Sequence, residues 1–183
     1  MTAIAVYCAS ATRIDPAFLD LAAEVGTAIG KRRHVLVTGG GSVAMMGAVG
    51  VAARAAGAHT VGVIPRHLVL MEVADHDSDE LVLVDTMRER KAEMDRRADA
   101  FLVLPGGIGT LEEFFEVWTA ASLGMHAKPV VVLDPSGFYA PLWSWLDDLS
   151  ERGFVRRTAL DTLVLARTVE EALTAAETGR LPG

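Results

Sequence analysis

Cysteine is almost absent from this sequence, which contains Cys8 alone. A lone cysteine excludes an internal disulfide and a zinc site built from cysteines. Because Cys8 ends an apolar run, we expect a buried and inert thiol. Histidine pairs spaced by four residues, a common metal-binding pattern on helices, are absent too. The histidines are His34, His59, His67, His76 and His126. We therefore expect no metal, and nothing else in the sequence calls for a cofactor.

Excess positive charge is also missing, because the formal net charge is −7. General nucleic-acid binders and membrane-surface binders need a cationic face, so we expect neither partner. No uninterrupted apolar run is long enough to span a bilayer. The first residues, MTAIAVYCAS, lack the basic region and the long apolar stretch of a signal peptide. These absences predict a soluble cytoplasmic protein.

Short apolar runs alternate with helical patterns along the chain. The runs cover residues 3–8, 34–38, 60–64, 81–84, 100–104, 129–133 and 163–166. The helical patterns cover residues 16–30, a stretch ending at 56, and residues 87–98, 111–122, 139–152 and 168–178. Continuous apolar strands separated by helices are typical of a parallel sheet covered on both faces. We therefore expect an α/β fold with a mostly parallel sheet, in a single domain over residues 1–183.

The stretch FLVLPGGIGTLEE, residues 101–113, organises the candidate site. It reads as a buried strand, a glycine turn and the start of a helix. Such a turn aims unpaired backbone N–H groups at one point, where a phosphate binds well. A simpler interpretation needs no ligand, because Thr110 and Glu113 fit a capping box, T-x-x-E. On this helix Glu112, Glu113 and Glu116 lie opposite the apolar face, where acidic side chains are normally solvated.

A second glycine turn, GGGSVA, starts at Gly39 and follows the second predicted strand. It fits the pattern G-x-G-x-x-G/A of dinucleotide sites, but no acidic residue ends the next strand to bind a ribose hydroxyl. A phosphate-binding turn is therefore favoured over NAD binding. No Walker lysine follows these glycines, and no G-x-S-x-G elbow is present, so neither an ATPase nor a serine hydrolase is supported.

The helical segment MRERKAEM places two cations between two methionines on one face, at Met87, Arg90, Lys91 and Met94. Burying an unpaired charge is costly, so these cations either snorkel to the edge or have an anionic partner. That partner is a substrate phosphate or a carboxylate such as Glu113. The acidic segment 66–80 shows no clear period, and we interpret it as a partly mobile loop near the site.

These motifs together resemble those of the LOG family, over nearly the whole chain. PGGIGTLEE is similar to the family signature P-G-G-x-G-T-x-x-E, and MRERKAEM to its M-x-x-R-K element. VYCAS, GGGSVAMMG and the segment starting KPVVVLD resemble three further family motifs. Family members are cytokinin riboside 5'-monophosphate phosphoribohydrolases, formerly mislabelled lysine decarboxylases. The resemblance implies a Rossmann-like fold, a homodimer, and hydrolysis of N6-modified AMP to free base and ribose 5-phosphate.

Motif by motif, the resemblance assigns catalysis to Arg90 and Glu113. It assigns substrate binding to Ser10, Gly40, Gly41, Glu72, Met87, Lys91, Gly106, Gly107, Gly109 and Thr110. A carboxylate suits this chemistry, because breaking an N-glycosidic bond builds positive charge on the ribose. An arginine is no proton donor at neutral pH, so Arg90 is expected to act electrostatically.

The sequence departs from the family pattern at Ala9, Ala44, Met45 and Ile108. The first three replacements bear on the geometry of the phosphate turns, and Ile108 on contacts near the base or ribose. Two alternative functions stay open from the sequence. One is a general purine or pyrimidine nucleoside monophosphate nucleosidase. The other is a non-catalytic carrier of a phosphorylated cofactor, such as the molybdenum cofactor; a pyridoxal-phosphate decarboxylase has only the old label behind it.

Overall fold

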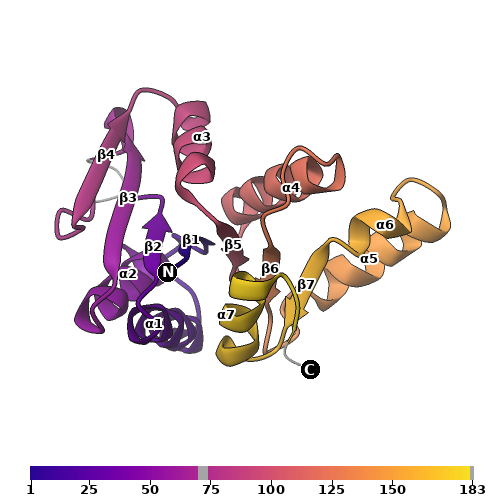
Figure 1. Cartoon of the computed structure of the whole chain (residues 1–183), viewed down its shortest axis with the longest axis horizontal. Helices are drawn as coiled ribbons and strands as arrows, with labels where there is room; N and C mark the ends of the chain where they lie inside the picture. The colour runs from indigo at the N-terminus through magenta and orange to yellow at the C-terminus, as the bar shows by residue number, and fades with distance from the viewer. Residues whose placement is uncertain (70–73, 182–183) are drawn as a thin grey trace.

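Seven parallel strands form one sheet in this computed structural model, which describes residues 1–69 and 74–181 (Figure 1). The strand order is β4-β3-β2-β1-β5-β6-β7. The strands are β1 (Ala3–Tyr7), β2 (Val35–Thr38), β3 (His59–Pro65), β4 (Glu80–Val84), β5 (Ala100–Val103), β6 (Val130–Leu133) and β7 (Leu163–Ala166). All registered pairs are parallel. The predicted α/β fold with a mostly parallel sheet is therefore confirmed.

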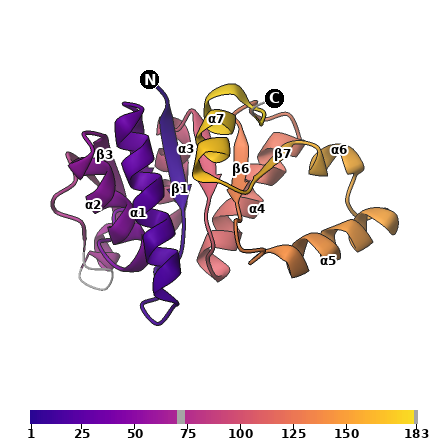
Figure 2. The same cartoon turned by 90° about the horizontal axis from the view of Figure 1, so that it is seen from below.

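Helices cover both faces of this sheet. They are α1 (Pro16–Lys31), α2 (Ala44–Ala55), α3 (Met87–Arg97), α4 (Ile108–Ser122), α5 (Ala140–Glu151), α6 (Arg157–Leu160) and α7 (Val169–Thr178), with a 3-10 turn, η1 (Arg66–Leu68). Figures 1 and 2 show α1, α2 and α7 on one side and α3 and α4 on the other, while α5 and α6 extend beyond β7. The four-residue helix α6 has too few residues to show a helical period in the sequence, and it was not predicted.

The two faces bury separate cores because side chains alternate along each strand. In β1, Ile4 and Val6 pack with α1, α2 and α7. Ala5 and Tyr7 point the other way, into the core formed with α3, α4 and α5. Strands that are buried on both faces appear in the sequence as continuous apolar runs. The edge strands β4 and β7 are partly exposed, but each still carries four consecutive apolar residues, so they were predictable as well.

The sheet has its topological switch point between β1 and β5. From β1 the chain adds strands outward through β2, β3 and β4, and from β5 it adds them in the opposite direction. The loops after β1 and β5 therefore diverge and leave a crevice at the carboxyl edge, where ligands bind in open α/β sheets.

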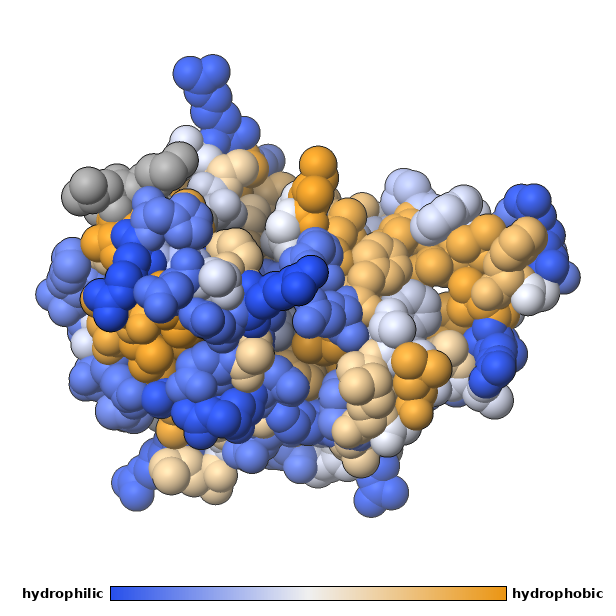
Figure 3. Space-filling view, turned by 90° about the horizontal axis from the view of Figure 1, so that it is seen from above, coloured by the Kyte–Doolittle hydropathy of each residue, from blue (hydrophilic) through white to orange (hydrophobic). Residues whose placement is uncertain are grey.

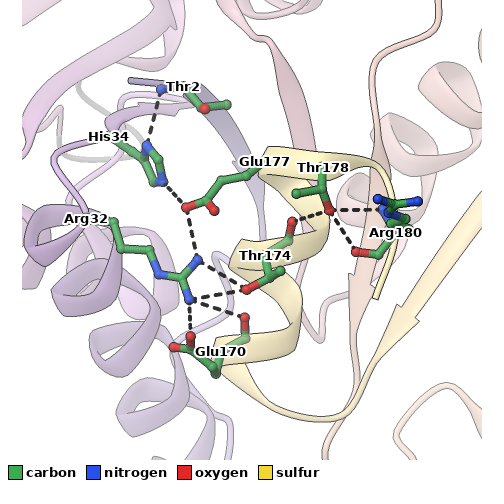
Figure 4. Close-up of polar contacts among 8 residues, drawn as sticks. All are labelled: Thr2, Arg32, His34, Glu170, Thr174, Glu177, Thr178 and Arg180. Carbon is green, nitrogen blue, oxygen red and sulfur yellow. Dashed lines mark hydrogen bonds and ion pairs between the residues drawn. The ribbon is translucent and has the colours of Figure 1, made fainter. Parts of the chain in front are cut away.

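A polar cluster far from this edge fastens α7 to the end of α1 (Figure 4). Arg32 forms an ion pair with Glu177 at 2.9 Å, and the ring of His34 contacts the same carboxylate at 2.7 Å. Burial alone would raise the pKa of Glu177, but its bonds to His34 and Arg32 outweigh burial and lower it.

None of the helices in the described ranges has the length and apolar character needed to cross a membrane.

Candidate active site

A pocket of about 340 Å³ lies at the switch point. Residues 8–11, which follow β1, form one wall, and the start of α4 forms another. It brings together seven of the residues predicted from the sequence: Ser10, Met87, Arg90, Gly107, Gly109, Thr110 and Glu113. Motifs that are up to about a hundred residues apart in the sequence thus converge on one concave site.

The wall formed by α4 is a helix N-terminus. The helix begins at Ile108, with Gly107 as its N-cap, and its first backbone bond runs from Leu111 N–H to the Gly107 carbonyl at 2.9 Å. The amides of residues 108–110 therefore have no acceptor within the helix, and all three residues line the pocket. With the positive end of the helix dipole, they favour an anion there.

The predicted capping box of Thr110 and Glu113 is wrong, because α4 starts two residues before Thr110. Thr110 lies inside the first turn, is only 4% exposed, and packs onto the backbone of Gly106. A Cβ at Gly106 would lie 2.1 Å from the Thr110 hydroxyl oxygen, so this position requires glycine. Gly106 therefore supports the turn from behind the pocket wall.

Arg90 is buried, with 4% of its surface exposed. Its Nη2 donates to the carbonyl of Gly39 at 2.7 Å, and its Nε donates to the carbonyl of Val63 at 3.1 Å. These carbonyls lie at the carboxyl ends of β2 and β3, and together they fix the plane of the guanidinium. The snorkelling interpretation is therefore wrong for Arg90, whose guanidinium lines the pocket from within the protein.

Lys91 faces a different cavity, although it follows Arg90 directly. Its ammonium forms ion pairs with Glu112 and Glu116 of α4. Burial alone would lower the pKa of Lys91, but hydrogen bonds to these two carboxylates outweigh burial and raise it. The expectation that both glutamates are merely solvated is therefore wrong, and Lys91 links α3 to α4. The second cavity, of about 640 Å³, shares Glu112 and Glu113 with the pocket.

The carboxylate of Glu113 affects the pKa values of two residues at the end of β1. Burial raises the pKa of the Cys8 thiol to about 12, and the carboxylate of Glu113 adds to the rise. Burial also raises the pKa of Tyr7 well above its usual value, with Glu113 as the largest charge contribution. Cys8 is thus the buried thiol expected from the sequence, and it stays protonated at neutral pH. The sequence did not indicate that Cys8 lines the pocket, although it precedes Ser10 at the same strand end.

The second glycine turn supports the pocket from outside. Gly40 and Gly41 are absent from the residues that line it. Gly40 has a φ of +76° and donates its N–H to the Thr38 hydroxyl at 3.2 Å, which bends the chain so that the Gly39 carbonyl meets Arg90. Glu72, also predicted to bind substrate, lies outside the described residues.

Two departures from the family pattern have visible consequences. Ala44 has a φ of +49°, in the left-handed region that favours glycine. Ile108 is 89% exposed at the pocket mouth and offers an aliphatic surface there.

Met46, which the sequence did not indicate, also lines the pocket. Among residues 1–69 and 74–181, no group of three or more His, Cys, Asp and Glu side chains is arranged to hold a metal ion.

Sequence comparison finds relatives along nearly the whole chain. A family model described as "Possible lysine decarboxylase" matches residues 46–176. Two proteins named cytokinin riboside 5'-monophosphate phosphoribohydrolase are 53% and 54% identical, from Mycobacterium marinum and Mycobacterium tuberculosis. The alignment with the first relative covers 96% of this chain and 94% of that protein. The alignment with the second covers 94% of this chain and 91% of that protein. A rice (Oryza sativa subsp. japonica) protein of the same name, LOG, is 45% identical over 92% of this chain and 69% of its own length.

Solved structures share the fold at lower identity. The molybdenum cofactor binding protein from Rippkaea orientalis matches with a TM-score of 0.73 and 21% identity, over 97% of this chain and 96% of that one. The molybdenum cofactor carrier protein from Chlamydomonas reinhardtii matches with a TM-score of 0.72 and 22% identity, over 96% of both chains. At this identity the likeness concerns the fold alone.

Proposed function

The chain belongs to the LOG family, and on that premise we propose that it hydrolyses N6-modified adenosine 5'-monophosphates to a free cytokinin base and ribose 5-phosphate. It is a hydrolase that acts on N-glycosyl bonds and releases the base from a nucleotide. The observation that supports this proposal most strongly is the pocket itself, where Arg90 and Glu113 meet a helix N-terminus at the switch point. Unmodified AMP is a further proposed substrate.

The 5'-phosphate binds at the start of α4 in this proposal. The amides of residues 108–110 supply donors that helix geometry leaves without partners, and Gly107 and Gly109 have open space where a Cβ would be. Ser10 offers a hydroxyl from the opposite wall. Gly40, Gly41, Gly106 and Lys91 act indirectly, because they hold the turn, α3 and α4 in place. Met87 contacts the nucleotide at the mouth of the pocket, where it is 40% exposed.

The bond that breaks joins C1' of the ribose to the base nitrogen. As it lengthens, the ribose gains oxocarbenium character, which the carboxylate of Glu113 stabilises. The same carboxylate orients a water molecule whose oxygen bonds to C1' as the bond from C1' to the base nitrogen breaks. The proton that this water loses balances the proton that the departing base takes up through solvent. Arg90 stays charged throughout, so it acts on the developing negative charge of the base or on the phosphate, or it orients Glu113.

The two alternative functions are not favoured. The three relatives described above, at 45% to 54% identity, are all named for phosphoribohydrolase activity. The molybdenum cofactor proteins share only the fold, at 21% and 22% identity. A carboxylate beside a phosphate site also opposes anion binding, which a carrier of a phosphorylated cofactor has no reason to accept.

We also propose that residues 1–183 act as one domain in a cytoplasmic homodimer, without nucleic-acid or membrane partners. Apolar surface gathers at the end of the molecule formed by α4 to α6 (Figure 3). Leu123, Trp145 and Phe154 are 67%, 55% and 74% exposed around a third cavity, of about 440 Å³. Exposed apolar patches of this kind mark protein contacts in soluble proteins, and a second copy of the chain is the proposed partner.

The proposed activity is tested with a panel of nucleoside 5'-monophosphates. The purified protein is incubated with AMP, N6-isopentenyl-AMP, GMP and CMP, and the released bases and ribose 5-phosphate are separated by chromatography. The proposal expects the N6-modified adenine nucleotide to give the highest kcat/KM. Equal cleavage of all four would instead indicate a general nucleosidase, and binding without cleavage would indicate a carrier.

A further inference from the structure

An arginine–aspartate pair lies behind the glycine turn that holds Arg90. Arg54 is near the end of α2, and Asp75 is in the segment before β4. Nη1 and Nη2 of Arg54 donate to the two carboxylate oxygens of Asp75, at 2.8 and 3.2 Å. The Asp75 and Arg54 side chains are 8% and 19% exposed. This parallel two-bond geometry is the strongest arrangement for an arginine–carboxylate pair, and it fixes orientation as well as distance.

Asp75 is joined directly to the glycine turn through its backbone. Its N–H donates to the carbonyl of Gly40 at 2.8 Å. The residue before it, Ala74, pairs with Gly41 in an antiparallel bridge. The segment that Asp75 anchors therefore runs against the turn and satisfies its backbone groups. Asp75 lies in the predicted loop, and within it both the carboxylate and the backbone N–H are bonded to other parts of the fold.

The same glycine turn is in direct contact with Arg90. Gly39, one residue before the bonded Gly40, accepts the 2.7 Å hydrogen bond from Nη2 of Arg90. A Cβ at Gly39 would lie 2.0 Å from that nitrogen, so the guanidinium rests directly on the turn backbone. A small displacement of the turn therefore displaces the guanidinium.

Helix α2 is shaped to receive the pair. A Cβ at Gly50 would lie 3.1 Å from Oδ2 of Asp75 and 3.4 Å from Nη1 of Arg54, which is one helical turn away. Glycine inside a helix is destabilising relative to alanine. The chain accepts this cost at a position where the carboxylate and the guanidinium meet against the helix.

We propose that Arg54 and Asp75 are positioning residues for Arg90, acting through the Gly39–Gly41 turn. Neither side chain lines the 340 Å³ pocket, so neither contacts the nucleotide. Two hydrogen bonds connect the pair to Arg90: the Asp75 N–H donates to the Gly40 carbonyl, and the Arg90 guanidinium donates to the Gly39 carbonyl. This inference rests on the proposed function only where the readout is turnover.

The kinetic test compares three variants at one temperature. Asp75→Asn keeps the size and the backbone N–H but removes the charge, and Arg54→Met removes the fork. Misplacing a charged group by about 1 Å costs up to ~10²-fold in rate, so we expect kcat to fall about 10- to 100-fold in both, with KM changed less than about threefold. Arg54→Lys keeps the charge and can still donate to Asp75, although without the planar fork, and should retain more activity than Arg54→Met.

Glu177→Gln serves as the matched control, because it also removes the carboxylate of an arginine ion pair. Its partners Arg32 and His34 precede β2, at the other end of that strand from the glycine turn. If the pair acts only through stability, Glu177→Gln and Asp75→Asn should unfold at lower urea concentration with unchanged kcat. Wild-type kcat in folded Asp75→Asn and Arg54→Met would overturn the proposal.

A second readout needs no substrate. The Nε–H signal of Arg90 is assigned in a nitrogen-15 spectrum as the arginine side-chain peak that disappears in Arg90→Lys. We expect this peak to move or broaden in Asp75→Asn and Arg54→Met, and to stay in place in Glu177→Gln. An unmoved peak in both folded variants would contradict the positioning role. If the wild-type protein cleaves no nucleotide, the proposed function fails, while this spectrum still decides whether the pair positions Arg90.

Discussion

Nη2 of Arg90 and the carbonyl oxygen of Gly39 are 2.7 Å apart, although 51 residues separate them in the sequence. The contact has no room for a side chain, since a Cβ at Gly39 would lie 2.0 Å from that nitrogen. The first glycine of the second turn is therefore required by the arginine. The sequence suggested that this turn is rich in glycine because it binds a phosphate. At its first residue, however, the guanidinium of Arg90 lies where a side chain would otherwise be.

Gly39→Ala should therefore abolish most activity while the fold survives. The added methyl group pushes the guanidinium out of its plane, and we expect kcat to fall about 10²-fold, as for other misplaced catalytic groups. The assay is ribose 5-phosphate release from N6-isopentenyl-AMP. Gly179→Ala is the comparison, because it adds a methyl group at a glycine of α7's end that does not line the pocket, where a Cβ would meet only Pro129, at 3.8 Å, in the described structure. Equal activity of Gly39→Ala and wild type would show that Arg90 tolerates displacement.

Ala44→Gly should stabilise the protein. Ala44 adopts a φ of +49°, and a non-glycine residue in this region costs about 1–2 kcal/mol. Glycine removes that strain but loses up to about 1 kcal/mol through its more flexible unfolded chain. We expect a net gain of about 0.5–1 kcal/mol in the free energy of unfolding, measured with urea. Ala48→Gly, inside the same helix at an ordinary φ, should instead be destabilising, and a loss of stability in both variants would argue against strain at Ala44.

Acid should weaken the link between α3 and β4. Hydrogen bonds from Arg96, and then from Arg97, lower the pKa of Glu93 to about 2, and Arg97 also bonds Glu80 of β4. Because the folded pKa lies below the unfolded value of about 4.3, the carboxylate stabilises the fold above that value. The contribution disappears as the pH falls from about 4.5 towards 2.

We therefore expect Glu93→Gln to cost about 1 kcal/mol in free energy of unfolding at pH 7, in keeping with a surface network that is partly screened by water. The difference from wild type should shrink between pH 4.5 and 2, measured by urea unfolding at several pH values. Glu24→Gln, on the exposed side of α1, removes a charge as a control. A difference that stays constant down to pH 2 would contradict the lowered pKa.

The fold was readable from the sequence because its signals are local. Buried parallel strands appear as apolar runs. Helix α1 likewise begins with a local signal, Asp15 before Pro16, and the Asp15 carboxylate accepts a hydrogen bond from Ala17 N–H at 2.9 Å. The site was only partly readable, since its partners are distant. Arg90 and Lys91 were predicted to share one helix face, but neighbouring residues on a helix point about 100° apart. As a result Arg90 contacts the ends of β2 and β3, whereas Lys91 contacts α4.

Contacts across the chain explain the remaining differences. The acceptors of Arg90 come from Gly39 and Val63, which no local pattern connects to α3. Thr110 and Glu113 have the spacing of a capping box, but Gly107 is the N-cap and the helix starts earlier. The spacing alone could not distinguish these two helix starts, because both satisfy local backbone geometry.

The structure also sharpens the test of the proposed catalytic pair. Glu113 lies in the second turn of α4, beyond the N-cap at Gly107, so it is not part of a capping box. Glu113→Gln keeps the size but removes the negative charge. We expect turnover of N6-isopentenyl-AMP to fall about 10²-fold or more, because the carboxylate no longer stabilises the ribosyl cation or orients water. Binding of inorganic phosphate, measured by calorimetry, should persist, because the amides at the start of α4 are unchanged.

Arg90→Lys completes this test. Lysine keeps the charge but has no planar fork, so it cannot donate to the carbonyls of Gly39 and Val63 with the geometry of Nη2 and Nε. We expect kcat to fall about 10²-fold here as well, with the fold retained by circular dichroism. Glu116→Gln is the matched control, because it removes a carboxylate of α4 that pairs with Lys91 and does not line the pocket. If both site variants cleave the nucleotide at the rate of this control, Arg90 and Glu113 are not the catalytic pair.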